Sequence, residues 1–308
     1  MPIILPDVPI TSQINDQIIL QLAAKYPFLR TEILTRTAFG RPLRALAIGN
    51  GSRKVIYTAA HHANEWITSY ILLKFVEELA QAIESGGRLW GVSAQNIASA
   101  ATIYLVPMVN PDGVDLVNGA IVPGELAYDL ARKLSENYPQ IPFPEGWKAN
   151  LMGVDLNLQY PAGWLQAREI KFSQGFTKPG PRDYVGRAPL GQAESRALAG
   201  FTQDIDPDLV LAYHTQGQAI YWKFRDIFVP GAQALAEEFA RVSSYTLEDT
   251  PYASAWAGYK DWFIQNFRRP GFTIEAGLGE NPLPLSQFDE IYRHNLGILV
   301  TAALGLSQ

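Results

Sequence analysis

His62 and Glu65 are the first residues in this chain whose types and spacing suggest chemistry. A neutral imidazole and a carboxylate three residues apart can converge on one metal ion. Zinc accepts nitrogen and oxygen donors and typically has three protein ligands and a water molecule at a catalytic site. The pair alone is weak evidence for a metal site. A hydrogen-bonded histidine at a strand end and an acid in the first turn of a helix give the same sequence pattern.

A strand and a helix are expected to position this pair. Residues 55–60 form a short apolar run with β-branched members, which predicts a buried strand that ends at His61 and His62. Residues 68–85 have the periodicity of a long helix. In open α/β sheets, ligands bind just beyond the carboxyl ends of the strands, so this junction is the expected place of a site.

Two further predicted strands end at residues of the same kind. His214 follows one of them and Glu275 follows the other, although the chain has only 4 histidines. Two histidines and a glutamate are a recognised catalytic zinc set, and another carboxylate can move the proton that hydrolysis requires. In isolation, His214 would more often be a hydrogen-bonded core residue, and Glu275 a buried acid paired with Arg268 or Arg269. The occurrence of these residues together, each at the end of a predicted strand, favours a hydrolytic metal site.

The remaining pattern alternates strands and helices. It predicts a single α/β domain over residues 1–308, with a mixed, mostly parallel sheet and helices on both faces. Residues 110–113 have the composition of a turn, and Ser12 is a candidate cap for the first helix. The long segment 137–189 has little periodicity, which is typical of a functional segment or a lid. The predicted helices are 11–26, 124–136, 192–201, 231–243, 258–266 and 288–304, and the other strands are 31–37, 43–48, 102–109, 209–213, 220–224 and 271–274.

Composition excludes several classes of function. The 308 residues are 47% hydrophobic, which is enough for a sizeable core, and the formal charge of -5 argues against a nucleic-acid partner. The absence of cysteine excludes disulfides, thiolate ligands and a cysteine nucleophile. The start of the chain lacks the features of a signal peptide, and no apolar run is long enough to cross a membrane. We expect a cytoplasmic protein, and its oligomeric state is not constrained by the sequence.

Taken together, the motifs resemble the zinc metallocarboxypeptidases of the carboxypeptidase A type. The resemblance implies that His62, Glu65 and His214 hold one Zn²⁺ ion per chain and that Glu275 is the general base and acid. It also implies that Asn157 binds a substrate carboxylate and that Tyr252 corresponds to the mobile tyrosine of the substrate pocket. The matching motifs, in the order of the family, are His62-Ala-Asn-Glu65-Trp66, Asn110-Pro-Asp-Gly113, Gly153-Val-Asp-Leu-Asn157, Tyr213-His214 and Thr273-Ile-Glu-Ala-Gly277.

Two departures from the family pattern concern arginines. Leu158 stands where the family usually has the arginine that grips the free carboxylate at the C-terminus of a peptide, and leucine cannot form that ion pair. Leu151 and Met152 stand near the expected place of the arginine that stabilises the oxyanion. Lys148 or an arginine from elsewhere could supply that charge, and the alternative for Lys148 is a solvated lysine.

A subgroup of the family accounts for the first departure. The chain is similar to bacterial gamma-D-glutamyl-L-diamino acid peptidases in stretches such as Gln159-Tyr-Pro-Ala162. The resemblance implies a murein peptide as substrate, a soluble muropeptide or intact wall, and no cell-wall-binding module is visible. Lys260 would favour a carboxylate such as that of diaminopimelate, unless it is an exposed helix lysine. The rival functions are an ordinary carboxypeptidase and a catalytically silent zinc-binding homologue.

Overall fold

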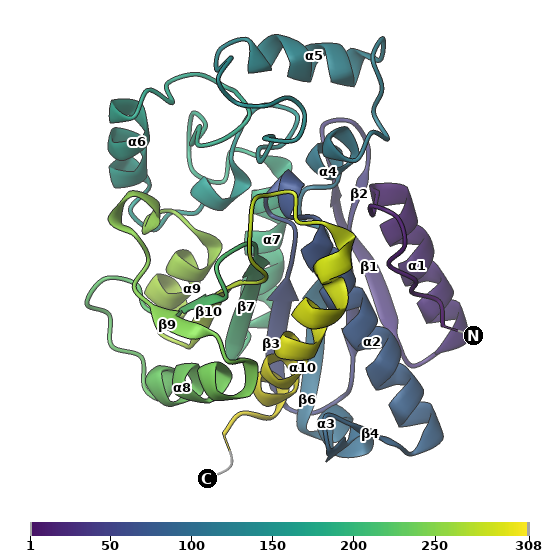
Figure 1. Ribbon diagram of the computed structural model, residues 1–308. Helices are drawn as coiled ribbons and strands as arrows, with labels where there is room; N and C mark the ends of the chain where they lie inside the picture. The colour runs from purple at the N-terminus through teal and green to yellow at the C-terminus, as the bar shows by residue number, and fades with distance from the viewer. Residues whose placement is uncertain (1, 307–308) are drawn as a thin grey trace.

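A mixed sheet of 8 strands forms the centre of the molecule in the computed structural model, which describes residues 2–306 (Figure 1). Its spatial order is β1-β2-β6-β3-β7-β10-β8-β9, and β4 and β5 form a separate pair. The strands are β1 Arg30–Arg36, β2 Pro42–Ile48, β3 Arg53–Thr58, β4 Arg88–Leu89, β5 Val92–Ser93, β6 Ala101–Val106, β7 Leu209–His214, β8 Ala219–Tyr221, β9 Thr246–Glu248 and β10 Gly271–Glu275.

Helices cover both faces of this sheet, as predicted (Figure 1). They are α1 Ser12–Lys25, α2 Ile67–Ser85, α3 Ala94–Ala100, α4 Pro111–Val117, α5 Leu126–Ser135, α6 Trp164–Ser173, α7 Ala193–Ile205, α8 Ala232–Ser243, α9 Tyr259–Phe267 and α10 Phe288–Leu304. Single 3₁₀ turns are η1 Ala63–Glu65, η2 Leu156–Leu158, η3 Tyr252–Ser254 and η4 Leu285–Gln287.

The central strands are buried on both faces, which explains their continuous apolar runs. Successive side chains of a strand point to opposite faces. Val55 and Tyr57 therefore pack in the cluster that contains α2 and α10, while Ile56 packs in the cluster that contains α7 and α9. The hydroxyl group of Tyr57 donates to the carbonyl oxygen of Leu299 at 2.8 Å, so its burial leaves no unpaired polar atom there.

The pairing directions make the middle of the sheet parallel. The pairs β6–β3, β3–β7 and β7–β10 are parallel, whereas β1–β2, β2–β6 and β10–β8 are antiparallel. The carboxyl ends of β3, β7 and β10 consequently lie side by side at one edge. This is the edge where the sequence places its candidate site.

Several local predictions were wrong. The cap of α1 is Thr11, whose side chain accepts a hydrogen bond from Ile14, whereas Ser12 binds Asp115. Residues 110–113 are the start of α4, because Asn110 caps the helix and proline fits its first turn. The segment 137–189 contains α6, whose weak amphipathicity gave no periodic signal. Strand β9 and helix α3 were also not predicted.

Among residues 2–306, no helix has the length and apolar character that crossing a membrane requires.

Candidate active site

Three adjacent strand ends bring the predicted site residues together. Glu275 pairs with His214 across β10 and β7, and His62 follows β3, the other neighbour of β7. Ala60 has a φ of +49°, in the left-handed region, where the chain turns away from β3. That conformation costs a non-glycine residue roughly 1–2 kcal/mol, and here it directs the following two histidines along the edge of the sheet.

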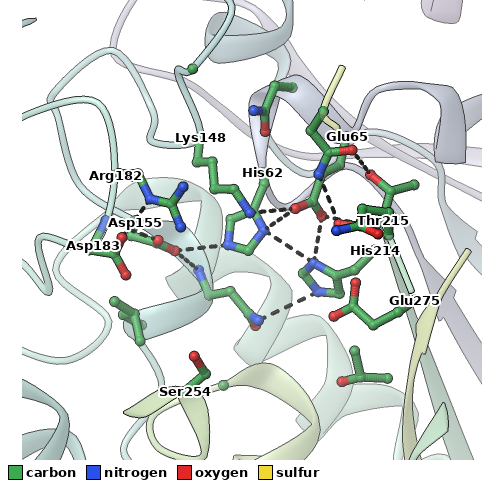
Figure 2. A pocket seen from close by; sticks show the side chains of 18 of the residues that line it. His62, Glu65, Lys148, Asp155, Arg182, Asp183, His214, Thr215, Ser254 and Glu275 are labelled. Atoms are coloured by element: carbon green, nitrogen blue, oxygen red, sulfur yellow. Dashed lines mark hydrogen bonds and ion pairs between the residues drawn. The ribbon is translucent and has the colours of Figure 1, made fainter. Parts of the chain in front are cut away.

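His62, Glu65 and His214 form one compact group (Figure 2). Glu65 Oε1 lies 2.9 Å from His62 Nδ1, Glu65 Oε2 lies 2.8 Å from His214 Nδ1, and the two Nδ1 atoms are 3.2 Å apart. Ligands about 2.0–2.1 Å from a tetrahedral zinc ion lie about 3.3 Å from one another. The donor types and their spacing therefore fit zinc, with one imidazole nitrogen from each histidine and one carboxylate.

Asn110 holds the segments that carry these groups. Its side-chain amide donates to the backbone carbonyl oxygens of His61, Lys148 and Ala149 at 3.0–3.2 Å. Next to it, a Cβ atom on Gly113 would lie 2.6 Å from the carbonyl oxygen of Ala149, so only glycine fits. The 110–113 motif therefore acts on the site by fixing the backbone around it.

Asp155 orients His62, the first histidine of this group. Its Oδ1 lies 3.2 Å from His62 Nε2 and also accepts a hydrogen bond from the backbone N–H of Asn157. A carboxylate on the distal nitrogen fixes the orientation of an imidazole ligand and raises its basicity. Burial opposes ionisation of Asp155, yet the neighbouring His62 holds the pKa of Asp155 below its usual range. Asp155 belongs to the motif Gly153-Val-Asp-Leu-Asn157, but only the fold reveals that His62 is its partner.

The charged side chains of the group shift one another's pKa values. Burial lowers the pKa of His62, but Glu65 and Asp155 outweigh it and raise that pKa to about 9. Burial opposes the charge of Glu65, whereas His62 and Lys148 hold the pKa of Glu65 well below its usual range. Burial lowers the pKa of His214, so this imidazole stays neutral and keeps a lone pair for a metal ion. An ionised carboxylate beside a neutral imidazole is the donor set expected where a dication binds.

Glu275 lies beside His214 at the end of β10 (Figure 2). Burial and the neighbouring Glu65 carboxylate raise the pKa of Glu275 to about 8. The alternative interpretation, a pair with Arg268 or Arg269, was wrong, because Arg268 is exposed and Arg269 binds Asp206 at 2.7 Å. Glu275 instead lines a cavity, where its carboxylate can exchange protons with a substrate.

A cavity of about 710 Å³ opens over the group and contains most of the predicted substrate-binding residues. Lys148 and Asn157 both line it. Lys148 Nζ donates to Glu65 Oε1 at 2.9 Å, so the alternative of a solvated lysine was wrong. Asn157 Oδ1 accepts a hydrogen bond from Tyr259 N at 3.1 Å, which fixes the side-chain amide. Leu151 is buried away from the cavity, and Met152 is 43% exposed.

Lys260 lines the cavity as expected, whereas Tyr252 does not. Lys260 is buried, so it is not an exposed helix lysine, and its Nζ donates to the carbonyl oxygen of Lys223 at 2.6 Å and pairs with Asp261 at 2.7 Å. It lines the cavity with its charge compensated. Tyr252 is 67% exposed, packs edge-on against Trp256 and does not line the cavity. A substrate-binding role for either residue stays a prediction.

Sequence reasoning missed Arg182, which lines the same cavity. Its Nε donates to Asp183 at 2.6 Å, and Figure 2 shows its guanidinium group turned toward His62. Arg182 lies in the aperiodic segment after α6. Arg182 lies outside the motifs shared with the family and does not follow a predicted strand, so no sequence signal marked it.

Comparisons with known proteins agree with this geometry. A family model described as zinc carboxypeptidase matches residues 16–297. The chain is 45% identical to gamma-D-glutamyl-L-diamino acid endopeptidase 1 of Lysinibacillus sphaericus over 283 residues, which are 92% of this chain and 69% of that protein.

Solved structures of carboxypeptidases share the fold. The carboxypeptidase A of Helicoverpa armigera superposes with a TM-score of 0.73 at 16% identity, covering 99% of this chain and 76% of that one. The murein-tripeptide amidase of Escherichia coli O157 superposes with a TM-score of 0.55 at 19% identity, covering 88% and 91%. The match over most of the chain, together with the His–Glu–His group at the sheet edge, shows that this protein belongs to the zinc carboxypeptidase family of metallopeptidases.

Proposed function

We propose that this protein hydrolyses the amide bond between D-glutamate and the diamino acid of murein stem peptides, with one zinc ion per chain. The observation that carries the hydrolytic part is the placement of Glu275 beside the group formed by His62, Glu65 and His214. The choice of bond is supported by the 45% identity to an endopeptidase named for it.

Leu158 supports an unusual mode of substrate recognition. Its side chain is buried in an apolar cluster with Trp164, Ala167 and Val185, so it offers no charge to the cavity. An ordinary carboxypeptidase needs a cation for the free C-terminal carboxylate, and at this position the chain has none. A peptide cut beside a diamino acid carries carboxylates in other places. Its recognition can therefore use other residues of the cavity.

The side chains have separate roles in the proposed reaction. When bound, the metal supplies a Lewis acid that polarises the scissile carbonyl group and lowers the pKa of water. Glu275 takes a proton from the attacking water and delivers it to the leaving amine as the carbon–nitrogen bond breaks. Lys148 supplies positive charge for the oxygen on which negative charge develops. Asn157 donates from its side-chain amide to a substrate carboxylate.

Digestion of L-Ala-γ-D-Glu-diaminopimelate-D-Ala, followed by mass spectrometry with zinc and with a chelator, tests the proposal. We expect L-Ala-D-Glu to appear only with zinc. The Glu275→Gln variant should keep its zinc and lose about 10²–10⁴-fold in kcat, the usual contribution of a general acid–base. Glu280→Gln is the matched control, because Glu280 lines the same cavity but is exposed at its rim.

Each rival function gives a different result in this experiment. Release of terminal D-Ala alone would identify an ordinary carboxypeptidase and contradict the proposed bond. An intact peptide in the presence of bound zinc would favour a catalytically silent homologue.

A further inference from the structure

Arg182 reaches the cavity from a loop that packs against the residue replacing the family arginine. Val185 of this loop and Leu158 belong to the same buried apolar cluster. Leu158 also lines the cavity, and its apolar side chain completes the cluster, a contact that an arginine would lose. The loop that leucine supports carries an arginine of its own, which lines the cavity on the same side as Asp155 (Figure 2).

Hydrogen bonds fix this loop to the active site. The backbone N–H groups of Lys148 and Ala149 donate to the carbonyl oxygen of Pro181 at 2.7 and 2.8 Å. The backbone N–H of Asp155 donates to the carbonyl oxygen of Tyr184 at 2.9 Å. The residues on both sides of Arg182 are therefore tied by hydrogen bonds to the segments that carry Lys148 and Asp155.

Asp183 orients the guanidinium group without neutralising it. Asp183 has a φ of +64° and lies between two cations, Lys171 Nζ at 2.6 Å and Arg182 Nε at 2.6 Å. One carboxylate thus compensates one of two positive charges, which leaves the trio with a net charge of +1. Within residues 2–306, Arg182 Nη1 and Nη2 have no protein acceptor, and Figure 2 shows them turned toward His62.

Each lysine that lines the cavity pairs with an acidic side chain through its single ammonium group. Lys148 binds Glu65, Lys171 binds Asp183, and Lys260 binds Asp261. Of the lysines and arginines that line the cavity in the described part of the chain, Arg182 alone offers a pair of terminal donors. Such a pair matches the two oxygens of a carboxylate.

We propose that Arg182 is a specificity-determining residue that binds a substrate carboxylate next to the scissile amide through Nη1 and Nη2. It takes the place of the arginine that Leu158 has replaced. This inference rests on the proposed function, in which the substrate has free carboxylates on both sides of the bond. One is the α-carboxylate of D-glutamate, and the others belong to the diamino acid.

The test compares matched peptides and matched variants. The peptides are L-Ala-γ-D-Glu-diaminopimelate, its analogue with the D-glutamate α-carboxylate amidated, its lysine analogue and its C-terminal amide. The variants are Arg182→Met, Arg182→Lys and Arg187→Met, the last because Arg187 is exposed on the same loop and does not line the cavity. Zinc content and thermal unfolding are measured for each variant.

The expected result is a loss of discrimination. The wild-type enzyme and Arg187→Met should prefer the free carboxylate at one position by about 10- to 150-fold in kcat/KM, as a charge-assisted hydrogen bond predicts. Arg182→Met should cleave the free and amidated peptides at nearly equal rates, and Arg182→Lys should fall between. The position at which discrimination disappears identifies which carboxylate Arg182 binds.

Other results would overturn the inference. The inference is wrong if Arg182→Met keeps the wild-type preference. It is also wrong if kcat/KM falls by the same factor on every peptide, because a uniform loss indicates a structural role. Calorimetric binding of the tripeptide to Glu275→Gln with and without Arg182→Met gives a second measurement without turnover. If the wild-type enzyme neither binds nor cleaves murein peptides, the proposed function fails. The same comparison on acyl-dipeptides with a free or an amidated C-terminus then decides the role of Arg182.

Discussion

Replacing Lys148 by methionine tests whether this lysine stabilises the oxyanion in place of the family's arginine. Methionine keeps much of the length and apolar volume of the side chain but removes its charge. Lys148 Nζ lies 2.9 Å from Glu65 Oε1, so it reaches the group at which a substrate carbonyl would be polarised. Its side chain is 17% exposed, so solvent screens its charge only in part.

The size of the effect follows from the distance and the surroundings. Two unit charges about 4 Å apart attract each other by about 4 kcal/mol at an effective dielectric constant of about 20. The loss of a single oxyanion donor typically costs about 10²–10³ in kcat, or about 2.7–4 kcal/mol. We therefore expect Lys148→Met to lower kcat by about 10²–10³ with little change in KM, because the charge acts mainly on the transition state.

Steady-state kinetics of tripeptide cleavage, with zinc content measured in parallel, tests whether Lys148 has this role. Removing a cation beside Glu65 relieves repulsion toward a dication, so Lys148→Met should bind zinc at least as tightly as the wild-type enzyme. Lys148→Arg should recover much of kcat, and the exposed Lys178→Met is the control. An unchanged kcat in Lys148→Met would refute the role of Lys148, and a lost metal ion would show that its role is structural.

Three further predictions concern the metal group and its neighbours. Burial lowers the pKa of His62, but Glu65 and Asp155 raise it to about 9, so the metal-free protein holds a proton there at neutral pH. Apparent zinc affinity in chelator competition should then rise about tenfold per pH unit between about pH 6 and 8, and a flat profile would contradict this. Asp155→Asn should weaken zinc binding about 10- to 100-fold in the same assay, because His62 loses its orienting carboxylate; unchanged affinity would argue against that role. Leu158→Arg should lower the free energy of unfolding by about 2–4 kcal/mol in denaturant titrations, because it removes leucine from its apolar cluster and puts a charged side chain beside that cluster. A stable Leu158→Arg variant that gains carboxypeptidase activity would show that one side chain sets the cleavage site.

The convergence of His62, Glu65 and His214 could be predicted because it depends on topology. Parallel strands end at a common edge, so residues that directly follow buried strands are neighbours even when they are far apart in the chain. His62 and His214 are 152 residues apart, yet their Nδ1 atoms lie 3.2 Å from each other. Apolar runs of strand length reveal where such strands end, and the residue types at those ends indicate the chemistry.

The substrate-binding part of the cavity could not be predicted in the same way. Lys260 and Asp261 adjoin in sequence, but nothing in their spacing shows that they form a buried pair. Tyr252 lies in a single 3₁₀ turn, and its exposure depends on how that turn packs on Trp256. Arg182 depends on long-range backbone hydrogen bonds, such as those from Lys148 and Ala149 to Pro181, that leave no periodic trace.

The loss of one arginine and the position of another are two consequences of the same packing. Leu158 lies next to Asn157 in a single 3₁₀ turn, and its apolar side chain joins the cluster with Val185. An arginine there would need a polar partner or solvent, and the loop after Pro181 would lose an apolar contact. With leucine, the loop is held close enough for its backbone to bind Lys148 and Asp155. In the proposed arrangement, a carboxylate site beside Asn157 is replaced by one beside His62, at a different position relative to the same catalytic group.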